Sequence, residues 1–191
     1  MLDFGLKFDD RVLLAVLLDD SLKLEEYLQQ NKNLINEKYS IECSYTPLIE
    51  VSLLHICAEY NHMNCARLLI QYGADVNSTA GLDKYGFGGQ SPIFHTVNQN
   101  SGNSKEVMEF LLANSVDLSL TVKGIIWGQN FPWETLIPSV NPISYAMMGL
   151  LPQMHRNEKR IADTVCLFLK HQFNLEYIPK NIPNKYLVGG K

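Results

Sequence analysis

The stretch Ser52–Asn77, SLLHICAEYNHMNCARLLIQYGADVN, decides how this chain folds. Apolar side chains recur in it at helical spacing in two runs, and Asn61-His62 separates the two runs. Gly73 ends the second run and leads into an extended Asp75-Val76-Asn77. Each predicted helix is too short to be stable alone in water. The pair must therefore stack on similar pairs, which predicts a repeat architecture.

Spaced motifs within this stretch carry a family resemblance. Ser52-Leu53-Leu54-His55 opens it, Cys57-Ala58 is a pair of small residues, and Arg67-Leu68-Leu69 is the apolar run of the second helix. Tyr72–Asn77 supplies the closing loop. The pattern resembles the ankyrin repeat, whose opening motif is Thr-Pro-Leu-His. The resemblance implies stacked helix pairs with hairpin-like loops, and it implies that His55 hydrogen-bonds between neighbouring loops as a structural residue.

Weaker copies of this unit flank it. Ser91-Pro92-Ile93 and Asn141-Pro142-Ile143 resemble further openings, whereas the N-terminal unit has none. The sequence predicts an all-α ankyrin-repeat solenoid of about four helix-pair repeats in a single domain over residues 1–191. The expected repeats cover residues 9–38, 46–77, 91–120 and 141–176. Thr46-Pro47-Leu48-Ile49 is a second possible opening of the second repeat; we choose Ser52, because the count from Ser52 to Asn77 fits the ankyrin register without a gap.

The openings are farther apart than the ankyrin period of about 33 residues, so the chain must contain insertions. Residues 78–90, STAGLDKYGFGGQ, hold four glycines and predict a loop or hairpin. Residues 119–141 predict a hairpin-like finger that turns at Gly128-Gln129-Asn130 and returns through Phe131 and Trp133. A further insertion is expected at residues 149–159. The tail, residues 177–191, is expected to be extended and to lie over the last helix.

Composition and charge exclude several classes of function. The net charge is −4, and the acidic excess lies in residues 1–50, which hold ten acids and five bases. This favours a solvated terminal repeat, with an acidic docking patch as the alternative. The sequence has no basic stripe with interleaved aromatic residues, so nucleic-acid binding is not predicted. No apolar run is long enough to span a membrane. The acidic N-terminus does not fit a signal peptide.

Four cysteines show no metal-ligand spacing: Cys43, Cys57, Cys65 and Cys166. The last three fall on apolar helix positions, where a free cysteine acts as a small hydrophobic residue. This usage favours a reducing, cytoplasmic location. No cofactor or metal is predicted.

The most distinctive functional residues are aromatic and lie in the insertions. Tyr85 and Phe87 belong to the glycine-rich loop, and Trp127, Trp133 and Glu134 belong to the finger. Because successive ankyrin loops project side by side, these five residues are expected to lie close together and to bind a partner protein. The finger rings could instead pack back as a local core between the two insertions, or alternation within Phe131-Pro132-Trp133 could pack one ring and offer the other. We predict protein–protein recognition through loop tips, insertions and first-helix faces.

Two other functions stay open. An enzyme or small-ligand binder could use His155, Arg156, Glu158 and Glu134, although no phosphate loop, serine elbow or His-Glu-x-x-His motif supports it. The chain is therefore predicted not to be an enzyme. A self-assembling structural protein would bury the finger against a second copy. A monomer is expected, with a homodimer as the alternative.

Overall fold

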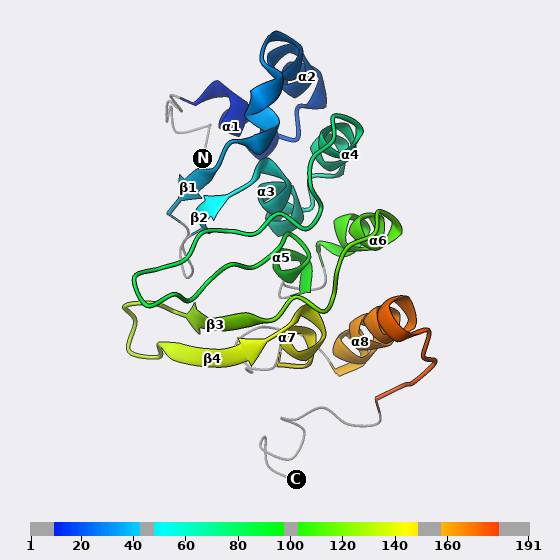
Figure 1. Cartoon of the computed structure of the whole chain (residues 1–191). Helices are drawn as coiled ribbons and strands as arrows, with labels where there is room; N and C mark the ends of the chain where they lie inside the picture. The colour runs from blue at the N-terminus through cyan, green and yellow to red at the C-terminus, as the bar shows by residue number, and fades with distance from the viewer. Residues whose placement is uncertain (1–9, 43–47, 98–102, 149–157, 180–191) are drawn as a thin grey trace.

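The computed structural model describes residues 10–42, 48–97, 103–148 and 158–179. Helix pairs stack into a row with hairpins projecting from one side (Figure 1). The outer layer holds α2 (Ser21–Gln30), α4 (Met63–Gln71), α6 (Lys105–Ala113) and α8 (Glu158–Phe173). The inner layer, between the outer helices and the hairpins, holds α1 (Arg11–Leu17), α3 (Leu53–Tyr60), α5 (Phe94–Val97) and α7 (Pro142–Met148). Along the row, α3 packs on α1, α5 on α3, and α7 on α5.

Besides the helix pairs, the described residues include two antiparallel two-stranded sheets, which project from the stack as hairpins. One pairs β1 (Tyr39–Ile41) with β2 (Leu48–Val51), just before the second helix pair. The other pairs β3 (Val122–Trp127) with β4 (Thr135–Val140) and forms the predicted finger. The first hairpin was missed because its strands are too short to show a clear alternation of apolar and polar residues. A short 3₁₀ helix, η2 (Lys32–Asn36), precedes it.

The second helix pair begins where the choice of Ser52 places it. Helix α3 starts at Leu53, directly after Ser52, whereas Leu48 and Ile49 of the rejected opening lie in β2. Thr46 and Pro47 lie outside the described residues, as do residues 149–157 and 180–191 of the predicted third insertion and tail. Residues 177–179 follow α8 without regular structure. No helix among the described residues is both long and apolar enough to cross a membrane.

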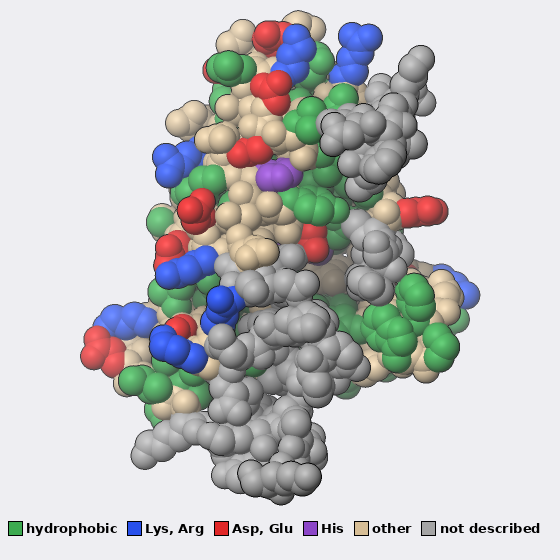
Figure 2. Space-filling view, turned by 180° about the vertical axis from the view of Figure 1, so that it is seen from behind, with side chains coloured by type: hydrophobic (Ala, Val, Ile, Leu, Met, Phe, Trp, Pro, Cys, Tyr) green, Lys and Arg blue, Asp and Glu red, His purple; other side chains and the backbone are tan. Residues whose placement is uncertain are grey.

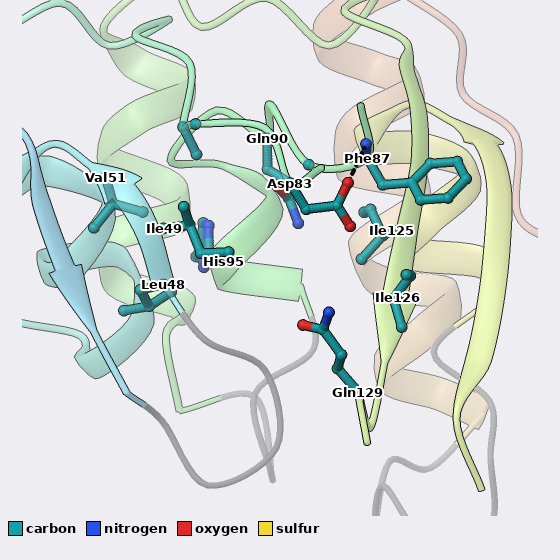
Figure 3. Close-up of a pocket in the computed structure, with 13 residues that line it drawn as sticks. Leu48, Ile49, Val51, Asp83, Phe87, Gln90, His95, Ile125, Ile126 and Gln129 are labelled. Atoms are coloured by element: carbon teal, nitrogen blue, oxygen red, sulfur yellow. Dashed lines mark hydrogen bonds between the residues drawn. The ribbon is translucent and has the colours of Figure 1, made fainter. Parts of the chain in front are cut away.

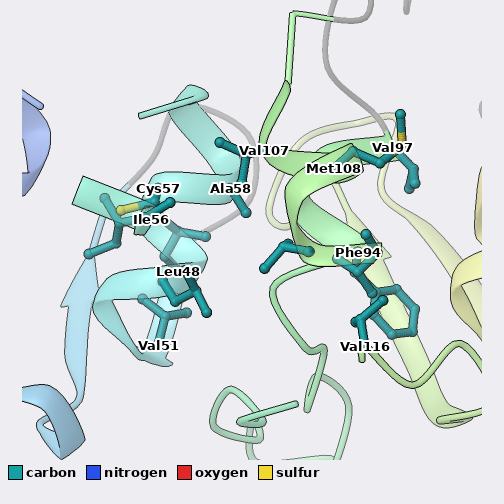
Figure 4. Close-up of a cluster of buried hydrophobic side chains, with 14 of the residues drawn as sticks. Leu48, Val51, Ile56, Cys57, Ala58, Phe94, Val97, Val107, Met108 and Val116 are labelled. Atoms are coloured by element: carbon teal, nitrogen blue, oxygen red, sulfur yellow. The ribbon is translucent and has the colours of Figure 1, made fainter. Parts of the chain in front are cut away.

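Small and large apolar side chains interlock between neighbouring pairs (Figure 4). Ile56, Cys57 and Ala58 of α3 are fully buried, and Phe94 of α5 and Val107 of α6 belong to the same core. The prediction that cysteines act as small hydrophobic residues is confirmed for Cys57 and Cys65, both fully buried. Burial raises the pKa of both thiols, so they stay protonated at neutral pH. Cys166 is only half-buried, and Cys43 lies outside the described residues.

His55 links one repeat to the next. Its Nε2–H donates to the backbone carbonyl of Gln90, 2.9 Å away in the following loop, which confirms its predicted structural role. On the other side of the ring, the Ser52 backbone N–H donates to Nδ1 (3.1 Å), and Ser52 Oγ lies 2.7 Å from the same atom. The ring is fully buried, and this burial lowers the pKa of His55 well below its usual value, with the nearby His95 acting in the same direction. His55 is therefore neutral at pH 7.

The next repeat lacks an equivalent of the His55 hydrogen bond. Ser91 stands where Ser52 does, but the position three residues later is Phe94, and His95 follows one position out of register. Phe94 is buried against Tyr145, with ring centroids 5.7 Å apart. Because Phe94 cannot accept a hydrogen bond, the buried hydroxyl of Ser91 has no hydrogen-bond partner among the described residues. An apolar contact with α7 therefore takes the place of a polar link.

The turns between paired helices cap the outer helix of the next repeat. Asp19, in the α1–α2 turn, accepts the Cys65 backbone N–H at the start of α4 (2.8 Å). Asn61, in the α3–α4 turn, accepts the Val107 backbone N–H at the start of α6 (3.1 Å). Both residues have left-handed backbone angles, with φ of 52° and 57°. Asp and Asn tolerate this conformation and supply a short acceptor, so one residue both ends a turn and caps the neighbouring helix.

We expect His55 to make stability depend on pH. Near pH 6.5 the unfolded ring gains a proton, whereas the folded ring stays neutral, so unfolding binds a proton and stability falls as the pH drops. This residue should contribute a loss of up to about 1.4 kcal/mol per pH unit below pH 6.5. Urea unfolding between pH 7.5 and 5.5 measures it. His55→Gln should lose this part of the slope, whereas Ser52→Ala should be less stable but keep it. Equal slopes in His55→Gln and the native protein would contradict the assignment.

A second prediction separates the two roles of Asn61. Asn61→Gly removes only the cap on α6 and should cost about 1 kcal/mol of unfolding free energy. Asn61→Ala also forces a side chain that disfavours positive φ into the turn and should cost roughly 1 kcal/mol more. Denaturant unfolding of the two variants checks the difference. If both variants are as stable as the native protein, Asn61 neither caps α6 nor shapes the turn.

Candidate functional site

Three segments form one continuous row on the hairpin side of the stack: the β1–β2 hairpin, residues 78–90 and the β3–β4 finger. Residues 78–90 lie between the two sheets, because the Gly81 N–H donates to the Ile49 carbonyl of β2 and the Gly88 N–H donates to the Gly124 carbonyl of β3, each at 2.9 Å. Figure 3 shows this loop lying between the β2 and β3 strands. Backbone hydrogen bonds thus fix each loop against the next. The prediction that Tyr85 and Phe87 lie beside the finger is confirmed.

The tip of the middle loop is held by Asp83. Its Oδ1 accepts the backbone N–H groups of Tyr85 (2.8 Å) and Phe87 (2.9 Å). Lys123 of β3 donates from Nζ to the Tyr85 carbonyl at 2.8 Å, which ties the tip to the finger. Tyr85 is 55% exposed in this fixed position, with Lys84 Nζ 4.9 Å from its ring centroid. Tyr85 is therefore an exposed aromatic side chain on a braced loop.

Phe87 has a different place from Tyr85. Its ring lies over Gly124 so closely that a Cβ atom on Gly124 would be 2.8 Å from Phe87 Cδ1. The Lys123 ammonium lies 5.1 Å from the centroid of the same ring, a cation–π contact. Phe87 is half-buried. It holds the middle loop on the finger, and only part of it faces outward.

The finger ends in a compact turn. The Phe131 N–H donates to the Gly128 carbonyl (2.9 Å), and Glu134 accepts the Asn130 backbone N–H on Oε2 (2.8 Å). The Trp133 ring lies against Gly128, whose φ of 60° and close approach both require glycine. Phe131 and Trp133 belong to this turn, and the return strand starts only at Thr135, later than predicted.

The two finger tryptophans have opposite environments. Trp133 is 43% exposed and stacks on Phe131, with ring centroids 5.3 Å apart. Trp127 is buried at 8% exposure, and its Nε1–H donates to the Tyr145 hydroxyl at 2.7 Å. The expectation that Trp127 contacts a partner is therefore wrong, because this ring joins β3 to α7. The alternative of one packed and one offered ring within Phe131-Pro132-Trp133 is not observed, because both rings are exposed and the packed ring is that of Trp127.

Three other apolar residues of this row are exposed: Leu82 and Leu136 were not predicted, and Phe131 was predicted only as one of the finger rings. Leu82 is 61% exposed, Leu136 49% and Phe131 41%. The buried residues of β4, Ile137 and Val140, are three positions apart, so a period of two would not have placed Leu136 on the outward face. Seen from behind, hydrophobic side chains gather on the protrusion at the lower right, whereas many charged side chains lie along the opposite side (Figure 2).

A shallow hollow opens between the two hairpins (Figure 3). Its volume is about 60 Å³, and Leu48, Asp83, His95, Ile125 and Gln129 are among its lining residues. Sites for drug-sized molecules usually measure about 300–1,000 Å³. The hollow is thus too small to enclose such a ligand.

The residues of the enzyme alternative do not form a site among the described residues. His155 and Arg156 lie outside them, as does the side chain of Glu158. Glu134 braces the finger turn. Within residues 10–42, 48–97, 103–148 and 158–179, no group of three or more His, Cys, Asp or Glu side chains is placed to hold a metal ion.

Comparison with known proteins agrees with this architecture. A family model described as "Ankyrin repeats (3 copies)" matches residues 14–122, which is more than half of the chain and runs from within α1 to the start of β3. Comparison with curated protein sequences finds no match. The matched copies are three, where the sequence predicted about four repeats. The stacked helix pairs, the His55 link between loops and the family match lead to one conclusion: the chain belongs to the ankyrin repeat family.

Proposed function

We propose that this protein binds another protein through the hairpin face, the surface formed by Leu82, Tyr85, Phe131, Trp133, Glu134 and Leu136. The observation that carries the proposal is the exposure of large apolar side chains on adjoining loops that hydrogen-bond to one another. Such side chains are the usual anchors of protein interfaces. Ankyrin repeats in general are protein-interaction modules, which supports the same reading.

The bracing of these loops favours tight binding. Asp83 fixes the middle loop, and Glu134 fixes the finger turn, before any partner arrives. A loop that is already ordered loses less conformational entropy when it binds. Tyr85 and Trp133 are then the main anchors, and Trp127 acts indirectly by holding the finger on α7 through Tyr145.

We also propose that α7 and α8 form a fourth repeat, within one domain. They pack against each other, and α7 packs on α5, as the earlier pairs do. Asn141 accepts the Ser144 backbone N–H on Oδ1 at 2.9 Å, which caps the start of α7 as an opening motif should. A cytoplasmic location is part of the proposal, since three thiols, Cys57, Cys65 and Cys166, are free.

The proposal predicts that the hairpin face retains a partner. The double variant Tyr85→Ser/Trp133→Ser should reduce recovery of a specific partner from native lysate by about tenfold or more, since anchor residues each contribute over about 1 kcal/mol. Leu22→Ser is the matched control, because Leu22 is 77% exposed on α2, away from the hairpins. Circular dichroism should show all variants folded. Equal recovery of every partner by native, double-variant and control proteins would remove the hairpin face as the binding site.

The alternative of self-assembly through the finger is tested separately. The protein should remain a 21.7 kDa monomer in light scattering at high concentration. The exposed pair Phe131 and Trp133 would otherwise bury itself against a second copy. A dimer that dissociates in Trp133→Ser but persists in Leu22→Ser would favour self-assembly over partner recognition.

A further inference from the structure

The outer strand of the finger has an edge that pairs with no other strand in the part of the chain that the structure describes. The β4 strand pairs with β3 on one side, and the β3–β4 sheet has two strands. The other side of β3 hydrogen-bonds to the middle loop, so β4 is the last strand of the row of hairpins (Figure 1). An unpaired edge offers backbone N–H and C=O groups to any other strand, including β4 of a second copy.

The hydrogen bonding of Gly124 shows which groups of β4 face this edge. The Gly88 N–H donates to the Gly124 carbonyl at 2.9 Å, so the backbone of Gly124 faces the middle loop and turns away from β4. In an antiparallel pair, two residues that oppose each other either hydrogen-bond across the pair or both face outward. Pro138 opposes Gly124, and Leu136 opposes Ile126. The backbone groups of Leu136 and Pro138 therefore point to the unpaired edge.

Pro138 removes one donor from this edge. A proline has no N–H, so position 138 presents only its carbonyl. Within sheets, proline is largely confined to edge strands, with its missing N–H on the solvent side, which agrees with the orientation derived from Gly124. Ser139 then adopts a left-handed φ of 51°, outside the extended conformation of a strand. The regular series of edge groups thus ends at Pro138.

Without the proline, this edge would complement itself. Two β4 strands that pair antiparallel about Ile137 would place position 136 of one copy opposite position 138 of the other, and these two positions would exchange N–H···O=C bonds. The two-fold symmetry of such a pair would repeat the exchange at the other end. Leu136 is 49% exposed and lies close to Gly124 on the face that Phe87 covers, so apolar side chains would also meet.

We propose that Pro138 blocks this pairing and thereby keeps two copies of the chain from joining through their β4 edges. Pro138 cannot donate a hydrogen bond to the carbonyl at position 136 of the second copy, and its ring occupies the place of the missing hydrogen. That carbonyl would be buried without a donor, which costs free energy. Replacing the proline should therefore be enough to let the two edges pair.

Light scattering of Pro138→Thr tests the block. Threonine supplies the missing N–H and favours strands. The variant should form a dimer whose fraction rises with concentration up to about 1 mM, where even weak association is populated. The native protein should stay a monomer over this range. So should Pro132→Thr, the matched control, because Pro132 is an exposed proline between the two strands. Circular dichroism should show all three proteins folded. A folded, monomeric Pro138→Thr, or a Pro132→Thr protein that dimerises equally, overturns the proposal.

Backbone amide exchange locates the contact and keeps the test decisive if Pro138→Thr does not fold. In the native protein, the Leu136 N–H should exchange at least about tenfold faster than the Ile137 N–H, which faces β3. Slow exchange of the native Leu136 N–H overturns the proposal, because the edge would already be covered. In Pro138→Thr, exchange at Leu136 should slow by about tenfold or more as the dimer forms. A dimer that leaves this rate unchanged is joined elsewhere and also overturns the proposal.

Discussion

The hydrogen bond from His55 to the Gln90 carbonyl joins the helix stack to the loops that carry the candidate site. The ring is fully buried, and it can make this bond while accepting from Ser52 only as one neutral tautomer. Gln90 ends the loop of residues 78–90, and that loop hydrogen-bonds in turn to β2 and β3. A single buried imidazole thus sets where the middle loop leaves the stack, and the position of Tyr85 depends on it.

The finger shows how one hairpin serves both the core and the surface. Trp127 and Tyr145 join β3 to α7, so the base of the finger belongs to the hydrophobic stack. Trp133 lies only six residues further on but sits in the turn, beyond the reach of α7, and stacks on Phe131 instead. The buried Trp127 ring holds the base of the finger on α7. The exposed Phe131 and Trp133 rings lie at the other end of the same hairpin, whose position is fixed in this way. Large aromatic side chains in one short segment therefore have different energetic roles.

Much of the fold could be predicted from short-range patterns. The helical spacing around Cys57 and Leu68 places α3 and α4, and Asn61 marks the turn between them. The β1–β2 hairpin could not be found in this way, because strands of three and four residues carry too little periodicity. At the candidate site, Tyr85 and Trp133 were identified because they are large and lie outside the repeat pattern. Leu82 and Leu136 were passed over because leucine is common in cores.

The sequence by itself determined that short amphipathic helices pair and stack, since neither helix of a pair can bury its apolar side alone. It also determined that His55 is structural and that the surplus residues lie in loops. Only the tertiary structure decided which aromatic rings are exposed. Burial of Trp127 depends on Tyr145, eighteen residues away and on another element, and no local pattern records that contact. Exposure depends on the packing of distant segments, so it emerges only when the stack is assembled.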